Sequence, residues 1–155
     1  MPKTKFPTDK RMARRRSGIH GSGVFAREFI PAGTRLAEYV GERITQAEGD
    51  LRYAGDDDGP GHTMLFTVDD DVVIDGGVRG NVSRWINHSC DPNCTSVIED
   101  RRVFIDSLRD IQPGEELTYD YHLIVNERHT PAVKRRHPCH CGAPNCRGTM
   151  LKPKR

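Results

Sequence analysis

Three cysteines near the end of the chain have the residue type and the spacing of a metal site. Cys139, Cys141 and Cys146 form the pattern Cys-x-Cys-x4-Cys. Thiolates are preferred ligands of Zn²⁺, which usually takes four ligands in a tetrahedron. The pattern therefore predicts a zinc site that lacks one ligand, and His140 and His137 are close enough in the sequence to supply it.

A second segment combines three chemically useful side chains in four residues. Asn87-His88-Ser89-Cys90 offers an amide, an imidazole and a thiol, directly before the turn-forming run Asp91-Pro92-Asn93. This combination is far more specific than a single histidine. Two further segments add to it: the glycines of Gly21-Ser22-Gly23 let a ligand approach the backbone closely, and Tyr119-Asp120-Tyr121 offers two phenol groups.

In their order along the chain, these segments resemble the motif set of the SET-domain methyltransferases. The matching segments are Gly21–Gly23, Tyr39–Gly41, Arg84–Asn93 and Glu115–Tyr121, and the resemblance extends from about Ser17 to Met150. It implies a mainly β fold of small curved sheets with short helices, in which the C-terminal segment threads beneath a preceding loop as a pseudoknot. It also implies methyl transfer from S-adenosylmethionine to the ε-amine of a lysine in a protein or peptide, such as a histone or another basic protein.

The resemblance implies a cofactor site as well. The loop Gly21–Gly23 would cradle the methionine part of S-adenosylmethionine. The side chain of Asn87 and the backbone of His88 would hold its amino and adenine groups. The complete set of residues expected at the cofactor is His20, Gly21, Ser22, Gly23, Arg84, Asn87, His88 and Tyr121.

Tyrosine hydroxyls are the groups expected to align the reaction. A lysine ε-amine has a reference pKa near ~10.4, and only its neutral form has a lone pair that can attack a sulfonium methyl group. The amine must therefore be bound without water, lose a proton to solvent, and be held in line with the departing sulfur. The resemblance assigns this role to Tyr121, with Tyr39 as a second hydroxyl in the lysine channel. Tyr119 stands where relatives carry Phe or Tyr, and its hydroxyl predicts mono- or dimethylation rather than efficient trimethylation.

For the zinc site, the resemblance offers another fourth ligand. Family members with such a tail fill the vacant position from the Asn-His-Ser-Cys segment, which implies Cys90 together with Cys139, Cys141 and Cys146. This closure would fix the tail over the active site and tie metal binding to the lysine channel. A local site completed by one of the tail histidines is the alternative. Cys94 is then left over, as a buried thiol that behaves like a small apolar residue.

The segments that must position these groups have the pattern of short β-strands separated by turns. Apolar and β-branched residues predict strands at Val24–Ala26, Arg35–Val40, Met64–Val68, Val72–Ile74, Thr95–Ile98 and Val103–Ile105. Proline and glycine predict turns at Pro31–Gly33, Asp75–Gly77 and Gln112–Gly114.

Two helical segments are expected between these strands. Thr45 and Glu48 have the spacing of a capping box, in which each side chain satisfies a free backbone donor of the other. The helix that starts there should end near Tyr53–Gly55. A second, shorter helical turn is expected at Arg84–Ile86.

The chain length predicts one compact domain with short appendages. We expect a loosely ordered basic leader at residues 1–16, the SET domain at 17–122, a linker at 123–138 and a zinc-binding post-SET tail at 139–155. The net charge of +2 is too small to predict binding to nucleic acid in general. No apolar run approaches the ~18 residues of a membrane span, and no secretory signal is visible.

Five cysteines, an odd number, disfavour a complete disulfide framework and favour thiolate or metal chemistry. The protein should therefore work inside a cell with reduced thiols, in the cytoplasm or in the nucleus. One alternative function is a catalytically inactive SET-like module that only binds a peptide. The presence of Tyr121 together with Asn87 and His88 argues against it, because a pure binder needs none of them. Another alternative is a methyltransferase that acts on a ribosomal or other basic protein instead of a histone.

Overall fold

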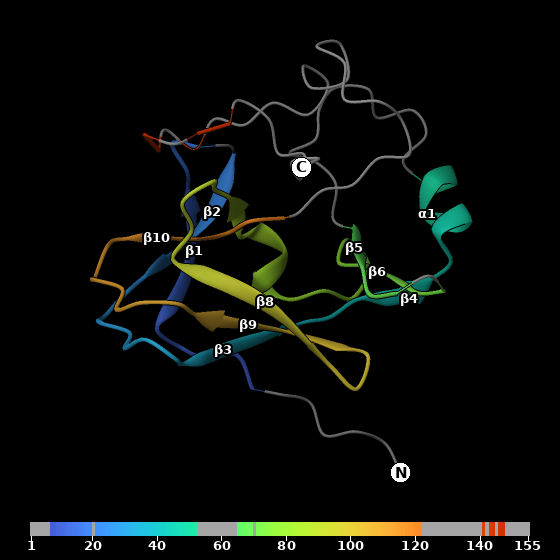
Figure 1. Ribbon diagram of the computed structural model, residues 1–155, viewed down its shortest axis with the longest axis horizontal. Helices are drawn as coiled ribbons and strands as arrows, with labels where there is room; N and C mark the ends of the chain where they lie inside the picture. The colour runs from blue at the N-terminus through green and yellow to red at the C-terminus, as the bar shows by residue number, and fades with distance from the viewer. Residues whose placement is uncertain are drawn as a thin grey trace.

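The computed structural model describes residues 7–19, 21–52, 65–69, 71–121, 141, 143–144 and 146–147, and short strands dominate this part of the chain. The strands form three small sheets, accompanied by the α-helix α1 (Gln46–Arg52) and the 3₁₀ helix η2 (Val82–Trp85) (Figure 1). The prediction of a mainly β fold of small sheets with short helices is confirmed. Neither helix in the described ranges has the length and apolar character required to cross a membrane.

Each sheet combines strands that are distant in the sequence. The first has the order β1 (Met12–Arg16), β2 (Ser22–Ala26), β10 (Glu116–Tyr119) and β7 (Asn87–His88). The second has the order β3 (Arg35–Tyr39), β9 (Arg102–Ser107) and β8 (Cys94–Glu99). The third has the order β4 (Glu42–Ile44), β6 (Val73–Asp75) and β5 (Leu65–Thr67), and Figure 1 shows it on the same side of the molecule as α1.

The strand β10 carries the C-terminal tyrosine motif into the first sheet. It pairs antiparallel with β2 and parallel with β7, where Thr118 lies opposite Asn87 and Tyr119 lies opposite His88. Two motifs that are far apart in the sequence therefore lie side by side. This is the neighbourhood expected of the pseudoknot, and the threading of the chain beneath a preceding loop stays a prediction.

Ordered structure begins before Ser17, inside the segment expected to be a loosely ordered leader, while the domain boundary itself stays a prediction. Residues 12–16, expected to belong to a loosely ordered leader, form β1 and pair along their whole length with β2. Met12 is buried in the core, whereas the three arginines that follow are exposed. Backbone pairing therefore holds this strand, and a single apolar anchor leaves no alternating pattern to detect. The strands β4 and β7, of three and two residues, also escape prediction, because they are too short to show an alternating pattern.

A continuous apolar core joins the first two sheets. Its fully buried members come from β2, β3, β9, β10 and the adjoining segments: Val24, Ile30, Leu36, Ile86, Ile105, Ile111 and Leu117. Burial of each such side chain contributes roughly 1.5–3 kcal/mol. The core therefore fixes β10, and with it the tyrosine motif, against the second sheet.

The predicted turns and the helix start appear where the sequence places them. Gly33 and Gly114 have φ of +76° and +86°, a left-handed conformation that favours glycine. Thr45 caps α1, since its Oγ1 accepts the N–H of Glu48 at 3.1 Å. The expected end of this helix, near residue 55, lies outside the described residues. The helical turn expected at 84–86 is η2, which begins and ends slightly earlier.

Candidate active site and metal centre

The three tyrosines predicted at the reaction centre lie in one aromatic cluster. Phe66 of β5 connects them, with its ring centroid 5.4 Å from that of Tyr39 and 6.3 Å from that of Tyr119. The rings of Tyr119 and Tyr121 are 5.0 Å apart. Tyr39 and Tyr119 are both only 4% exposed. Since Tyr39 ends β3 and Tyr119 ends β10, the cluster stands where the three sheets meet.

Tyr121 is fixed by a hydrogen bond at each end. Its hydroxyl donates to the carbonyl oxygen of Ile86 at 2.5 Å, and its backbone N–H donates to Nδ1 of His88 at 3.0 Å. Because the phenol O–H already donates to a carbonyl oxygen, the hydroxyl oxygen can only accept a hydrogen bond from any further neighbour. It is thus suited to hold the N–H of an amine or a polarised methyl C–H group.

Burial keeps these phenols protonated. Removal from solvent raises the pKa of Tyr119 well above its ordinary value, and the neighbouring Tyr121 and Tyr39 raise it further. The pKa of Tyr121 is likewise raised, first by burial and then by the nearby carboxylate of Glu116. A raised phenol pKa means that the neutral form persists to higher pH. Neither hydroxyl therefore acts as a tyrosinate base at neutral pH, and a proton that leaves a bound amine must pass to water.

His88 links the Tyr121 segment to the loop that follows β7. Because Nδ1 of His88 accepts the N–H of Tyr121, the proton of the neutral ring is assigned to Nε2. This nitrogen lies 3.6 Å from Sγ of Cys90 and can donate to it. The imidazole is therefore engaged within the protein, and the contact of the His88 backbone with a cofactor stays a prediction.

A carboxylate supports the glycine loop and Asn87. The Asn87 amide nitrogen donates to the carbonyl oxygen of Ser22 at 3.1 Å and to Oε2 of Glu116 at 2.9 Å. Glu116 also accepts the Ser17 hydroxyl at 2.8 Å, and a Cβ on Gly23 would collide with its Oε2. These contacts fix the orientation of the Asn87 amide, whose carbonyl oxygen Oδ1 is an acceptor suited to an ammonium group.

Arg84, a predicted cofactor residue, has its described contacts elsewhere. Nη1 of Arg84 donates to the carbonyl oxygen of Gly76 at 3.3 Å, and its guanidinium lies 4.9 Å from the centre of the Trp85 ring. Arg14 lies over the same ring at 3.9 Å. His20 lies outside the described residues. The parts of Arg84 and His20 in cofactor binding stay predictions.

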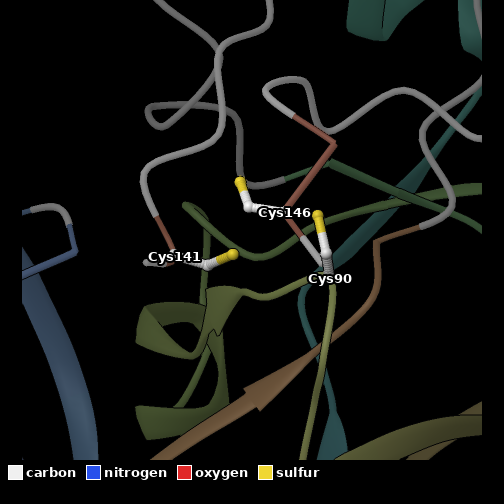
Figure 2. A group of neighbouring side chains, drawn as sticks. All are labelled: Cys90, Cys141 and Cys146. Carbon is white, nitrogen blue, oxygen red and sulfur yellow. The ribbon is translucent and has the colours of Figure 1, made fainter. Parts of the chain in front are cut away.

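Cysteines from two distant parts of the chain form a possible metal centre. The Sγ atoms of Cys90, Cys141 and Cys146 all lie within 4.8 Å of one another, and Figure 2 shows Cys90 beside the two tail cysteines. Tetrahedral thiolates around Zn²⁺ at ~2.3 Å would be about 3.8 Å apart, so only small shifts are needed to bind the ion. This geometry favours Cys90 as a ligand. Cys139 and the rival ligands His140 and His137 lie outside the described residues.

The remaining cysteine has the properties expected of a structural thiol. Cys94, at the start of β8, is fully buried among core side chains. Burial raises the pKa of its thiol to about 12, so it stays protonated and unreactive at neutral pH.

Comparison with known proteins identifies the family. The SET domain family matches residues 21–122, more than half of the chain. This chain belongs to the SET-domain family. A relative from Saccharomyces cerevisiae, named histone-lysine N-methyltransferase, H3 lysine-4 specific, is 46% identical over 142 residues, which cover 87% of this chain and 13% of the yeast protein.

Two further relatives of this SET domain come from other organisms. Histone-lysine N-methyltransferase TRX1 of Oryza sativa subsp. japonica is 40% identical over 148 residues, covering 91% of this chain and 14% of the rice protein. Histone-lysine N-methyltransferase set1 of Dictyostelium discoideum is 42% identical over 148 residues, covering 91% of this chain and 9% of that protein. The chain thus spans only a small part of the length of these relatives.

Several residues of the SET-domain site escape prediction from the sequence. Glu116 supports the glycine loop, Phe66 joins the tyrosines, and Arg147 contacts both Asp120 and Cys90. Each acts through a partner that is distant along the chain, and a single Glu, Phe or Arg has no distinctive spacing. Their position next to recognised motifs could have indicated two of them: Glu116 begins the strand that carries Tyr119, and Arg147 directly follows Cys146.

Proposed function

We propose that this SET domain transfers methyl groups from S-adenosylmethionine to the ε-amine of lysine 4 of histone H3. The observation that carries the proposal is the position of the half-buried Tyr121, whose hydroxyl donates to Ile86 and can accept from a further neighbour, beside the segment of Asn87 and His88. The substrate is inferred from the printed specificity of the yeast relative.

The site has the donors and acceptors that S-adenosylmethionine requires. When bound, this cofactor supplies a methyl group on a positively charged sulfur, which is already a strong electrophile. Oδ1 of Asn87 would accept from its ammonium group, and the backbone of Gly21–Gly23 would line its methionine part. A Cβ at Gly23 would collide with Glu116, which also holds the amide of Asn87, so the glycine lets this loop lie close beside Asn87. His20, Arg84 and the backbone of His88 complete the proposed contacts.

The tyrosines would align the reaction without taking the proton. The lysine ammonium loses its proton to water before it is enclosed, and Tyr121 accepts one of the remaining N–H groups, which aims the nitrogen lone pair. The cofactor would supply the methyl group for the new C–N bond, and its sulfur would keep the electron pair of the C–S bond. Tyr39 would line the same channel. The Tyr119 hydroxyl reduces the space for an already methylated amine, so mono- or dimethylation is the proposed product.

The metal centre would have a structural role. Cys90, Cys141 and Cys146 would hold Zn²⁺ together with Cys139 as the fourth ligand, in the closed coordination typical of structural sites. Such a site supplies no reacting group. It fastens the tail to the loop that follows β7, two residues beyond His88. A histone substrate would place the protein in the nucleus, at chromatin.

A methyl-transfer assay with a defined peptide tests the proposal. The zinc-loaded protein is incubated with S-adenosylmethionine and a peptide of the H3 N-terminus, and the products are mapped by mass spectrometry. We expect one or two methyl groups on lysine 4, and none on a matched peptide in which arginine replaces this lysine.

Parallel reactions with whole histones and with a soluble extract define the alternatives. Methylation of another basic protein, with lysine 4 unmodified, would overturn the proposed substrate. Binding of peptide and cofactor without transfer to any lysine would overturn the proposed activity and leave a binding module.

A further inference from the structure

The C-terminal tail is joined to the tyrosine motif by an ion pair. Nη1 of Arg147 donates to Oδ2 of Asp120 at 2.8 Å, and Nη2 donates to Oδ1 at 3.3 Å. The side chains are only 23% and 16% exposed, respectively. A paired contact between a guanidinium and a carboxylate fixes the relative orientation of both groups, and partial burial reduces its screening by salt.

The same arginine contacts the metal centre. Its backbone N–H donates to Sγ of Cys90 at 3.3 Å. Cys90 in turn lies 3.6 Å from Nε2 of His88, the residue whose Nδ1 holds the N–H of Tyr121. A backbone N–H that points at a thiolate stabilises its negative charge. Arg147 therefore contacts the Tyr121 segment directly through Asp120, and indirectly through Cys90 and His88.

Asp120 is well placed to transmit this contact to the pocket. It lies between Tyr119 and Tyr121, whose rings belong to the aromatic cluster, while its own carboxylate engages the tail. Oδ1 of Asp120 also lies 3.6 Å from Nδ1 of His88. A displacement of Asp120 would therefore act both on the backbone that carries Tyr121 and on the imidazole that holds the Tyr121 N–H.

We propose that Arg147 is a positioning residue of the methyl-transfer site, whose ion pair with Asp120 holds the Tyr121 hydroxyl in its reactive orientation. This inference rests on the proposed function. Two contacts would then hold the tail in place, the cysteine cluster and the ion pair. Alignment of Tyr121 requires both contacts.

A double-mutant cycle with the zinc-loaded protein tests this role. Arg147→Met keeps the length of the side chain but removes its charge, and should lower kcat ~10–100-fold with a much smaller change in the KM of the peptide. Arg147→Lys keeps the charge but offers one contact instead of two, and should give an intermediate kcat. Asp120→Asn should resemble Arg147→Met, and the double variant should be scarcely worse than either single one. Arg101→Met, which removes an exposed ion pair with Asp69, is the matched control and should leave kcat unchanged.

A second readout does not depend on activity. Release of zinc to a chelator should be about 10-fold faster in both Arg147→Met and Asp120→Asn than in the wild type, because the tail is held less firmly. Wild-type kcat and wild-type zinc release in these variants would overturn the inference, and so would additive losses in the double variant. An inactive wild type would contradict the proposed function alone, since the rate of zinc release still tests whether the ion pair holds the tail. Should Arg147→Met unfold, the isosteric Asp120→Asn decides the question.

Discussion

At the scale of single residues, the reaction centre depends on hydroxyl groups that stay neutral. Tyr121 gives its proton to the carbonyl oxygen of Ile86, and burial raises the pKa of both Tyr119 and Tyr121. Ionisation of Tyr121 would remove the proton that its hydroxyl donates to Ile86, and ionisation of either phenol would place a charge in the aromatic cluster. The sign of the shift places that ionisation above the ordinary tyrosine range of about 10, and therefore outside the working pH.

This protonation state predicts a simple dependence of the rate on pH. Between pH 7 and pH 9, kcat/KM for a lysine peptide should rise by about tenfold per pH unit, because the neutral fraction of an amine with a pKa near ~10.4 rises by that factor. No falling limb should appear in this range, since the raised pKa keeps both phenols protonated. The measurement is the initial rate at low peptide concentration, with stability checked by return to pH 7. A bell-shaped profile with a descending limb below pH 9 would contradict the assignment.

At the scale of elements, β10 must be held in register for the tyrosines to meet Asn87. The buried amide of Asn93, 2% exposed, holds this strand: it donates to the carbonyl oxygen of Glu116 at 2.8 Å and accepts the N–H of Thr118 at 2.9 Å. It also donates to Oε2 of Glu115 at 3.1 Å. One side chain thus ties the loop before β8 to three positions of β10 or its approach.

Asn93→Asp should therefore destabilise the fold although the two side chains have the same shape. The new carboxylate loses both donors and faces a carbonyl and a carboxylate oxygen, so the variant should lose about 3 kcal/mol of unfolding free energy. Urea unfolding can be followed by the fluorescence of Trp85, the single tryptophan of the chain. Asp91→Asn, an exposed neighbour, is the control and should change the unfolding free energy by less than ~0.5 kcal/mol. Equal stabilities of the two variants would show that Asn93 does not hold β10.

The sequence predicts those elements that bury a face and misses those held by pairing alone. Val24–Ala26 and Val103–Ile105 lie on β2 and β9 because their apolar side chains fill the core. β1 presents three arginines to solvent and shows no pattern, yet it pairs with β2 over five residues. The same distinction holds for the site. Compact motifs such as Asn87–Cys90 can be recognised in the sequence, whereas the contact between Arg147 and Asp120 exists only in the folded chain and could not be predicted.

At the scale of the whole molecule, three small sheets bring their ends to one place, and the tail residues Cys141, Cys146 and Arg147 lie beside Cys90 and Asp120. The tyrosine cluster is formed by residues of β3, β5, β10 and the segment after β10, while Cys141 and Cys146 lie beside Cys90, two residues beyond β7. The reaction centre of this SET domain is therefore formed by several segments, none of which forms the site alone. Function should be lost when their mutual alignment is lost, even where every segment remains folded.

The most direct test of the aligning role of Tyr121 is the single-turnover rate of methyl transfer to the H3 peptide by the wild type and by Tyr121→Phe. Affinity for S-adenosylhomocysteine, measured by calorimetry on both proteins, serves as the control for folding and cofactor binding. We predict a rate at least ~100-fold lower in the variant with an unchanged affinity, because only the aligning hydroxyl has been removed. A variant that binds the cofactor product equally well and transfers methyl groups at the wild-type rate would contradict the central role of Tyr121.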